Sequence, residues 1–326
     1  SVHEKKCLSC ERSGNCEFQK LCNDMGIEEE NRFEGAVPAG NKDFSTPYLE
    51  RNNAKCILCR RCVAACQSQH VSVIGANNRG FDTEIGCAFE KPLGDVACVA
   101  CGQCIVSCPT GALTEKDNTQ EVLDAIHDPD KVVIVQTAPA VRAALGEEFG
   151  LPIGTNVEGK MVAALRRLGF DKVFDTDFGA DMTIMEEATE FIHRVKNGGT
   201  LPMITSCSPG WVKFCEHYYP DLVDNLSTCK SPQNMTGALI KTWYAQKEGI
   251  DPNNIVSVSV MPCTAKKFEI KRDDEDAAGL PDVDISITTR ELARLIKKAQ
   301  LNFDRLPEEK FDDAMGVSTG AAVIFG

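Results

Sequence analysis

"CILCRRCVAAC" (residues 56–66) and "CVACGQCIVSCP" (residues 98–109) repeat one cysteine pattern. Each stretch has the spacing C-x2-C-x2-C-x3-C, and the second ends in Cys-Pro. This spacing is typical of a segment that holds two 4Fe–4S clusters, in which the fourth cysteine of each run ligates the other cluster. A pair of zinc sites is the weaker alternative, because zinc does not need two such dense runs. We expect one cluster on Cys56, Cys59, Cys62 and Cys108, and a second on Cys98, Cys101, Cys104 and Cys66.

Composition narrows the class of protein. The chain has 326 residues and 17 cysteines, and a disulfide scaffold fits their two-residue spacings poorly. Thiolate ligands need reducing conditions, so we expect a cytoplasmic protein, and we find neither a signal peptide nor an apolar run that could span a membrane. The net charge of -13 argues against binding to nucleic acid, which requires a basic surface.

The pattern of residues predicts three parts. Residues 1–45 carry a short cysteine cluster and a linker, residues 46–125 carry the two cysteine runs, and residues 126–326 alternate between β-branched runs and helical patterns. This alternation predicts an α/β domain with parallel sheets flanked by helices. Strands are expected at 132–136, 172–177, 201–206, 255–263 and 283–287, and helices at 139–149, 159–170, 180–199, 211–223, 231–246 and 288–300.

Cysteines outside the two runs give further expectations. Sites in parallel sheets form where strands end, and Cys207 and Cys263 each follow a predicted strand. We expect Cys87, Cys215 and Cys229 to be buried as small apolar side chains.

The N-terminus offers a third ligand set, made of one histidine and three cysteines. Alone, three thiolates and an imidazole at this spacing favour zinc, but the following cysteine runs favour a third 4Fe–4S cluster. Cys22 is an alternative fourth ligand to the histidine. The set consists of His3, Cys7, Cys10 and Cys16.

Longer motifs resemble a known family. They are "FDTDFGADMTIMEEATEF" (174–191), "TSCSPGW" (205–211), "KSPQ" (230–233), "MPCTAKKFE" (261–269) and "TTRELARLIKKA" (288–299). These stretches resemble the catalytic domain of iron-only (FeFe) hydrogenases, and the cysteine runs resemble the ferredoxin-like domain of multi-cluster members. The resemblance covers nearly the whole chain. It implies α+β ferredoxin-like iron–sulfur domains followed by an α/β catalytic domain.

The resemblance also implies a reaction and a cofactor. The reaction is the reversible interconversion of dihydrogen with two protons and two electrons. The cofactor is the H-cluster, a 4Fe–4S cluster joined by a cysteine sulfur to a two-iron subsite that carries CO, cyanide and a bridging amine dithiolate. The protein would carry three 4Fe–4S clusters besides the H-cluster. Its electron partner would be a ferredoxin, a flavin subunit that uses NAD(H), or a formate dehydrogenase.

Individual residues match the family's motifs. Cys207 matches the thiol that passes protons to the bridging amine. The residues that match the family's proton relay to solvent are Glu187, Ser227 and Glu190, with Arg194 at its outer end. From sequence alone, the two glutamates would be assigned to a solvated helix face. Cys263 matches a ligand of the H-cluster cubane, and Lys266 matches the cation that binds a cyanide ligand. Other pocket residues are expected at Ala138, Pro139, Ser231, Gln233, Met261 and Phe325.

The chain departs from the family pattern at two places. The common motif is TSCCPxW, and its second cysteine, a cubane ligand, is replaced here by Ser208. A serine hydroxyl is a poor iron ligand, so Cys207 could bind the cubane and leave the relay. The family's third motif, ExMxCxxGCxxGGGxP, does not occur before Gly326, so the chain supplies one or two of four expected thiolates.

Three explanations fit these departures. The chain is truncated, a separate chain completes the domain, or the protein has kept electron transfer and lost catalysis. The apolar end "AAVIFG" favours a missing partner segment. The alternatives to a hydrogenase are therefore a non-catalytic electron-transfer or scaffold subunit and, less favoured, a redox sensor.

Overall fold

The computed structural model describes Cys7, Cys10, residues 12–27, residues 40–313, Gly316, Ser318 and Gly320. Its contacts divide the chain into two compact units, residues 1–116 and residues 117–326. This division lies ahead of the expected boundary at residue 125, because the segment that follows Asp117 forms a helix that packs on the second unit. None of the described helices has the length and apolar character that a membrane span requires.

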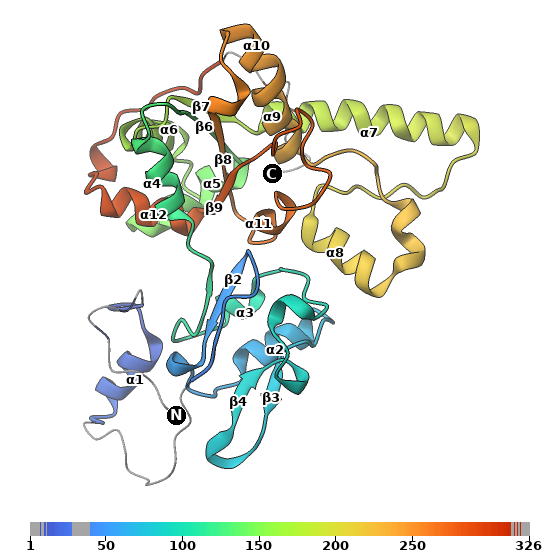
Figure 1. Cartoon of the computed structure of the whole chain (residues 1–326). Helices are drawn as coiled ribbons and strands as arrows, with labels where there is room; N and C mark the ends of the chain where they lie inside the picture. Colours follow the sequence, from blue (N-terminus) through green and yellow to red (C-terminus); the bar gives the residue numbers. More distant parts are fainter. Residues whose placement is uncertain are drawn as a thin grey trace. The chain divides into compact units, whose positions relative to one another are not determined.

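The first unit is built from short elements around the cysteine runs (Figure 1). An antiparallel sheet has the order β1-β2-β5, and strands β3 and β4 form a hairpin. Helices α2 and α3 begin inside the two cysteine runs and pack on each other. The bounds are α1 Glu17–Asp24, β1 Lys42–Asp43, β2 Leu49–Asn52, α2 Arg61–Ser68, β3 Gly75–Asn77, β4 Glu84–Gly86, α3 Gln103–Val106 and β5 Leu113–Glu115.

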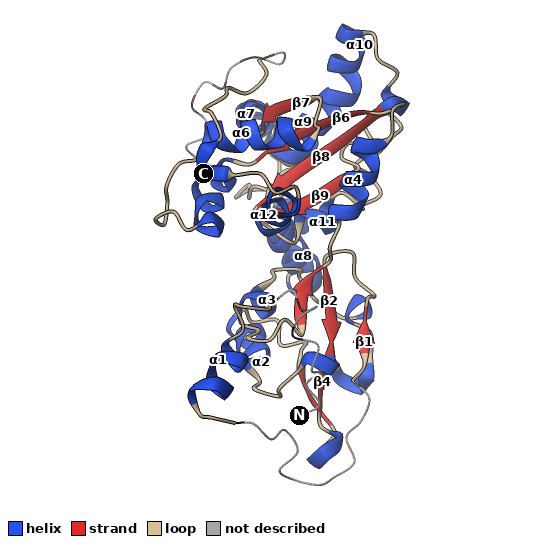
Figure 2. Ribbon diagram, turned by 90° about the vertical axis from the view of Figure 1, so that its left-hand side faces the viewer, coloured by secondary structure: helices blue, strands red, loops and turns tan. Residues whose placement is uncertain are grey.

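The second unit is a parallel sheet with helices on both faces (Figure 2). The strand order is β7-β6-β8-β9, and all three strand pairs are parallel. The predicted architecture, ferredoxin-like iron–sulfur domain followed by helix-flanked parallel sheet, is confirmed. The strands are β6 Val132–Thr137, β7 Lys172–Asp175, β8 Ile255–Met261 and β9 Ile285–Thr288.

Alternate residues of the strands enter two cores. In β6, Val133 and Val135 pack against α4 Thr119–His127, α6 Glu158–Leu168 and α12 Thr289–Lys298, while Ile134 faces the other side. There it meets Ile240 and Tyr244 of the π-helical turn η8 Ile240–Tyr244. Burial on both faces explains why the strands read as continuous apolar runs. The remaining helices are α5 Pro139–Ala144, α7 Asp177–Asn197, α8 Pro209–Tyr218, α9 Pro232–Leu239, α10 Ala245–Glu248 and α11 Lys266–Glu269.

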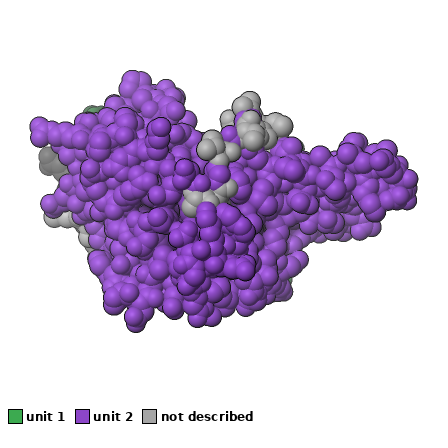
Figure 3. All heavy atoms as spheres, turned by 90° about the horizontal axis from the view of Figure 1, so that it is seen from above, with its two compact units in different colours: residues 1–116 green, residues 117–326 purple. Residues whose placement is uncertain are grey.

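Helix α7 reaches beyond the sheet layers and forms a projecting part of this unit (Figure 3). It packs on α9, where Gly179 lets the two backbones approach closely. This contact matters for the site, because α7 carries Glu187 and Glu190, and α9 follows Ser231.

Several local predictions were wrong. Residues 201–206 form no strand of the sheet, because the backbone of Ile204 bonds instead to Asn225 and Ser227, across a single parallel bridge. The helix expected at 231–246 is interrupted by the π-turn at Ile240–Tyr244. In contrast, the helix expected at 288–300 is present, and it begins with a capping box between Thr288 and Glu291.

Candidate metal clusters and active-site pocket

The first set of four thiols lines one pocket of the first unit. Cys56, Cys59 and Cys62 come from the first run, and Cys108 comes from the second. Burial, together with the charges of the three other thiolates, raises the pKa of the Cys62 thiol to about 12. Four thiolates this close repel one another unless a cation lies between them. Four thiolates are also the donor set that an iron–sulfur cluster requires. The structure thus brings together the predicted crossed set.

The second set is also brought together. Burial raises the pKa of Cys104 well above its ordinary value, and the thiolates of Cys98, Cys101, Cys62 and Cys66 add to this shift. Cys101 shows the same influence of Cys98 and Cys66 after that of burial. Cys66 of the first run therefore lies among the thiols of the second run, as the crossover rule predicts.

The backbone of the two runs adopts the same unusual conformation. Leu58 and Arg60 have φ angles of 58° and 60°, and the equivalent Ala100 and Gly102 have 59° and 73°. Residues other than glycine rarely adopt positive φ, and such turns point backbone N–H groups into a concave surface that suits anionic groups, including iron–sulfur centres. The amide of Leu58 already donates to the Cys56 sulfur at 3.4 Å.

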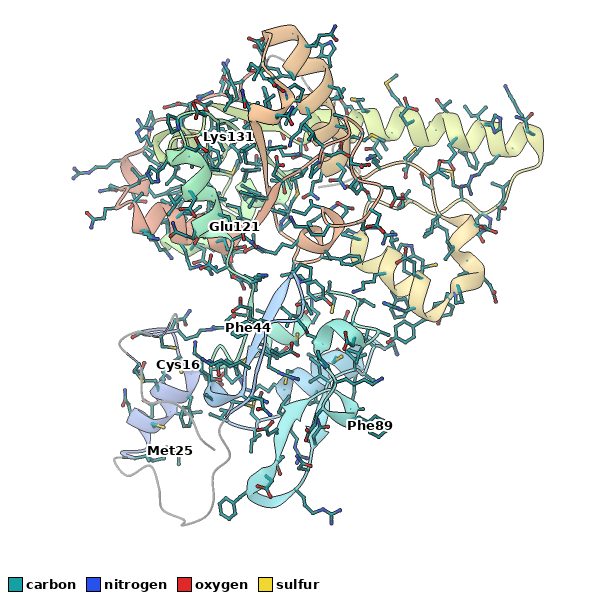
Figure 4. The ribbon with its side chains drawn as sticks, viewed as in Figure 1. Cys16, Met25, Phe44, Phe89, Glu121 and Lys131 are labelled. Atoms are coloured by element: carbon teal, nitrogen blue, oxygen red, sulfur yellow. The ribbon has the colours of Figure 1, made fainter. Side chains whose placement is uncertain are left out.

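The N-terminal set is described in part. Cys7 and Cys10 are joined by a backbone hydrogen bond of 3.2 Å, and Cys16 lies just before α1 (Figure 4). Its sulfur is 3.9 Å from the carbonyl of Pro109, and Arg12 donates to the carbonyl of Cys108 at 3.1 Å. This segment therefore contacts the end of the second cysteine run. His3 lies outside the described residues.

Within the part of the chain that the structure describes, no three His, Cys, Asp or Glu side chains are arranged to hold one metal ion. Ligands of a cubane surround eight atoms, so they stand farther apart than ligands of a single ion.

A pocket of about 210 Å³ opens at the carboxyl ends of β6, β7 and β8 in the second unit. Loops that leave parallel strands meet at this edge, which explains why residues distant in sequence converge here. Its lining includes most of the predicted pocket residues: Ala138, Pro139, Cys207, Ser208, Gln233, Met261, Cys263 and Lys266. Phe325 lies outside the described residues.

A buried carboxylate, Glu269, organises one wall of this pocket. Its oxygens accept hydrogen bonds from Lys266 at 2.9 and 3.1 Å, from Ser231 at 2.8 Å and from Gln233 at 2.9 Å. Ser231 stands at the N-cap position of α9, but its hydroxyl donates to Glu269 and does not cap the helix. Lys266 also donates to the carbonyl of Cys207 at 2.8 Å. The ammonium group is thus fixed beside the pocket.

The predicted relay residues converge between α7 and the segment at 225–229. Glu187 is buried, and its Oε1 has no hydrogen-bond partner among the described residues. Ser227 interacts with Glu187 and also donates to Glu190 at 3.2 Å. Glu190 in turn accepts from Arg194 at 3.0 Å. Glu187 is near enough to Cys207 to raise the pKa of that thiol, although burial contributes most.

The two glutamates are tuned in opposite directions. Burial raises the pKa of Glu187, and hydrogen bonds from Ser227 and Ser206 offset this only in part. Burial also acts to raise the pKa of Glu190, but hydrogen bonds from Arg194 and Thr228 outweigh it, so the pKa of Glu190 is lowered. An inner carboxyl with a raised pKa next to an outer carboxyl with a lowered pKa is an arrangement that is suited to passing protons.

Some functional residues were not found from the sequence. Glu269 was missed, although it lies one helical turn after Lys266 and could have been identified as an i,i+3 partner. Thr228 was missed because its contact with Glu190 crosses between distant segments. Cys87 and Cys215 are buried as expected, whereas Cys229 is half-buried with its sulfur 3.7 Å from Glu190.

Comparisons with known proteins assign each part of the chain to a family. Residues 131–326 match the iron-only hydrogenase large subunit, C-terminal domain. Residues 55–112 match the 4Fe-4S dicluster domain, and residues 1–31 match the NADH-ubiquinone oxidoreductase-G iron-sulfur binding region.

Similar proteins include the NADP-reducing hydrogenase subunit HndD of Solidesulfovibrio fructosivorans (54% identity) and iron hydrogenase 1 of Clostridium pasteurianum (47%). Each match covers 100% of this chain and 57% of the relative, so the chain spans little more than half of their length. A solved structure of apo FeFe-hydrogenase HydA1 from Chlamydomonas reinhardtii matches 63% of this chain and 53% of its own chain, with 46% identity and a TM-score of 0.58. The chain therefore belongs to the iron-only (FeFe) hydrogenase family, as its motifs predicted.

Proposed function

We propose that this chain is the electron-relay and catalytic part of an enzyme that interconverts dihydrogen with protons and electrons. The observation that carries the proposal is the pocket at the end of the parallel sheet, where Cys207, Cys263 and Lys266 meet. The relay of Glu187, Ser227 and Glu190 leads away from this pocket.

Two 4Fe–4S clusters are assigned to the two crossed sets of thiols in the first unit. The donor chemistry and the repeated backbone turns support this assignment. A third cluster is assigned to the N-terminal set of Cys7, Cys10 and Cys16 with His3 or Cys22. Electrons would then pass through clusters carried by one unit before they reach the pocket of the other.

The residues of the pocket fit part of the H-cluster's surroundings. Cys263 would supply a thiolate to its cubane, and Lys266 would bind an anionic diatomic ligand. Ser208 stands where the family has a second cubane thiolate, so among the described residues this chain offers an incomplete set. When bound, the H-cluster supplies the centre at which protons and electrons combine.

The chain's own groups would move the protons. Cys207 lines the pocket, and burial raises the pKa of the nearby Glu187, which favours the protonated carboxyl. The hydroxyl of Ser227 lies between two carboxylates and can accept a proton from one while it donates to the other. The hydrogen bond from Arg194 lowers the pKa of Glu190 at the outer end, so this carboxyl releases a proton readily.

The electron partner is proposed to be a subunit that exchanges electrons with a pyridine nucleotide. One relative is named an NADP-reducing hydrogenase subunit, and residues 1–31 resemble part of NADH-ubiquinone oxidoreductase. A ferredoxin and a formate dehydrogenase are the alternative partners. Because thiolate ligands need reducing conditions, the cytoplasm is the proposed location.

A pair of neighbouring substitutions tests this proposal. Glu187→Gln removes a buried proton carrier, whereas Glu186→Gln changes an exposed residue of the same helix. With the protein purified anaerobically from cells that assemble the H-cluster, hydrogen evolution from reduced viologen is measured. We expect Glu187→Gln to lose at least about 100-fold in rate, and Glu186→Gln to match the wild type. Equal rates for both variants would refute the proposed proton route.

A further inference from the structure

An arginine is buried beside the first set of thiols. Arg51 lies on β2, where Leu49 and Arg51 occupy the two buried positions of the alternating pattern. Only 10% of its side chain is exposed to solvent. A permanently charged group at a core position needs a compensating partner.

Its protein partners account for only part of the guanidinium. Nη2 pairs with Oδ2 of Asp43 at 3.3 Å, but this oxygen already accepts from the amide of Leu93 at 2.9 Å. The other oxygen of Asp43 accepts from the amide and hydroxyl of Ser45. Among the residues that the structure describes, Nε and Nη1 of Arg51 have no partner within hydrogen-bond geometry, and the one further group beside the guanidinium is the buried thiol of Cys87, a weak acceptor. Buried donors without acceptors are costly, so a further acceptor is expected here.

The position of Arg51 indicates what this acceptor is. Arg51 lines the same pocket as Cys56, Cys59, Cys62 and Cys108. It is also close enough to Cys56 to favour the thiolate, although burial dominates and raises the pKa of that thiol. Sulfur atoms at this pocket would give the two free N–H groups their acceptors.

We propose that Arg51 sets the reduction potential of the cluster at this pocket, by donating hydrogen bonds to its sulfurs and by its charge. The proposal rests on the cluster assignment made above. The cluster gains one electron on reduction, and this adds a negative charge to a buried group. A buried cation next to it favours the reduced form, so the potential rises. Electrons that move along the cluster chain would therefore settle preferentially at this cluster.

The exposed Arg60 provides a matched control, because it lines the same pocket but solvent screens its charge. The reduced fraction of each cluster is followed by electron paramagnetic resonance during a titration with dithionite as reductant. The cluster in question is identified as the signal that Cys108→Ala removes. At a fixed potential we expect Arg51→Gln to lower its ratio of reduced to oxidised form about tenfold, a downward shift of about 59 mV for one electron. Arg60→Gln should shift it much less.

A variant with the opposite effect separates this role from a structural one. Asp43→Asn removes the negative partner and keeps the arginine, so we expect the ratio to rise. This variant carries the test if Arg51→Gln does not fold. An unchanged or lowered ratio in Asp43→Asn, or equal shifts in Arg51→Gln and Arg60→Gln, would overturn the inference. A wild-type protein with no signal that depends on Cys108 would instead overturn the cluster assignment.

Discussion

The carboxylate of Glu269 is expected to stabilise the pocket wall more than any other charge there, because it is the counter-charge of the buried Lys266 ammonium. It is 5% exposed as a side chain and lies 2.9 Å from the ammonium of Lys266. At this distance the gross attraction is about 6 kcal/mol with an effective dielectric constant near 20. The substitution Glu269→Gln keeps one oxygen acceptor and replaces the other with a donor, which then faces Ser231 and Gln233. Because the ammonium stays buried without its counter-charge, we expect a loss of about 3 kcal/mol in the free energy of unfolding.

Thermal unfolding followed by circular dichroism measures this loss. For a domain of this size, 3 kcal/mol lowers the melting temperature by roughly 6 to 12 °C. The matched control is Glu148→Gln, which breaks a pair with Lys297 whose side chains are 38% and 50% exposed, and which should cost less than about 1 kcal/mol. If Glu269→Gln melts within about 2 °C of the wild type, as the control should, the buried pair does not organise the pocket.

Three further predictions concern the cluster, a buried acid and a helix contact. Cys108→Ala should remove about four irons per chain, because the crossed set loses a ligand, and an iron assay that finds no loss would exclude the crossing. Burial raises the pKa of Asp177 to about 6; the charge of Asp175 adds to this shift and that of Arg142 opposes it. The protonated Asp177 therefore contributes to stability at low pH, and this contribution is lost as the pH rises through about 6. Asp177→Asn lacks this loss and should gain stability relative to the wild type between about pH 4 and pH 7; a difference in melting temperature that is independent of pH would contradict the shift. In Gly179→Ala the new methyl group would collide with the hydroxyl of Thr236 and the carbonyl of Pro232, which should cost roughly 1–3 kcal/mol in a denaturant titration, and a neutral result would show that α7 can move away from α9.

The sequence allowed the sheet and its active edge to be predicted, because buried parallel strands have a strong compositional signature. The run that becomes β8 ends where the structure places the pocket, so the position of Cys263 at this edge followed from the strand pattern, whereas Ala138 was expected only from the resemblance to the family. The same reasoning failed for residues 201–206, which pair with a neighbouring loop. The alternation of apolar residues cannot show which partner a short segment will bond.

The polar contacts of the site could not be predicted in the same way. The interactions of Glu269 with Ser231 and of Glu190 with Thr228 join segments that are far apart in the chain. Each residue by itself has the character of an ordinary surface or capping residue. Only their burial and mutual distances identify them as a network, and these come from the packing of α7, α9 and α11.

The central claim is that the pocket at the end of the parallel sheet holds a hydrogen-converting iron centre. Infrared spectroscopy of the protein, purified anaerobically from cells that assemble the H-cluster, tests it most directly. We predict bands of iron-bound CO and cyanide in the wild type, and a shift of the cyanide bands in Lys266→Met, where the ammonium beside the pocket is removed. A wild-type protein that carries its 4Fe–4S clusters but has neither CO nor cyanide bands would contradict the account.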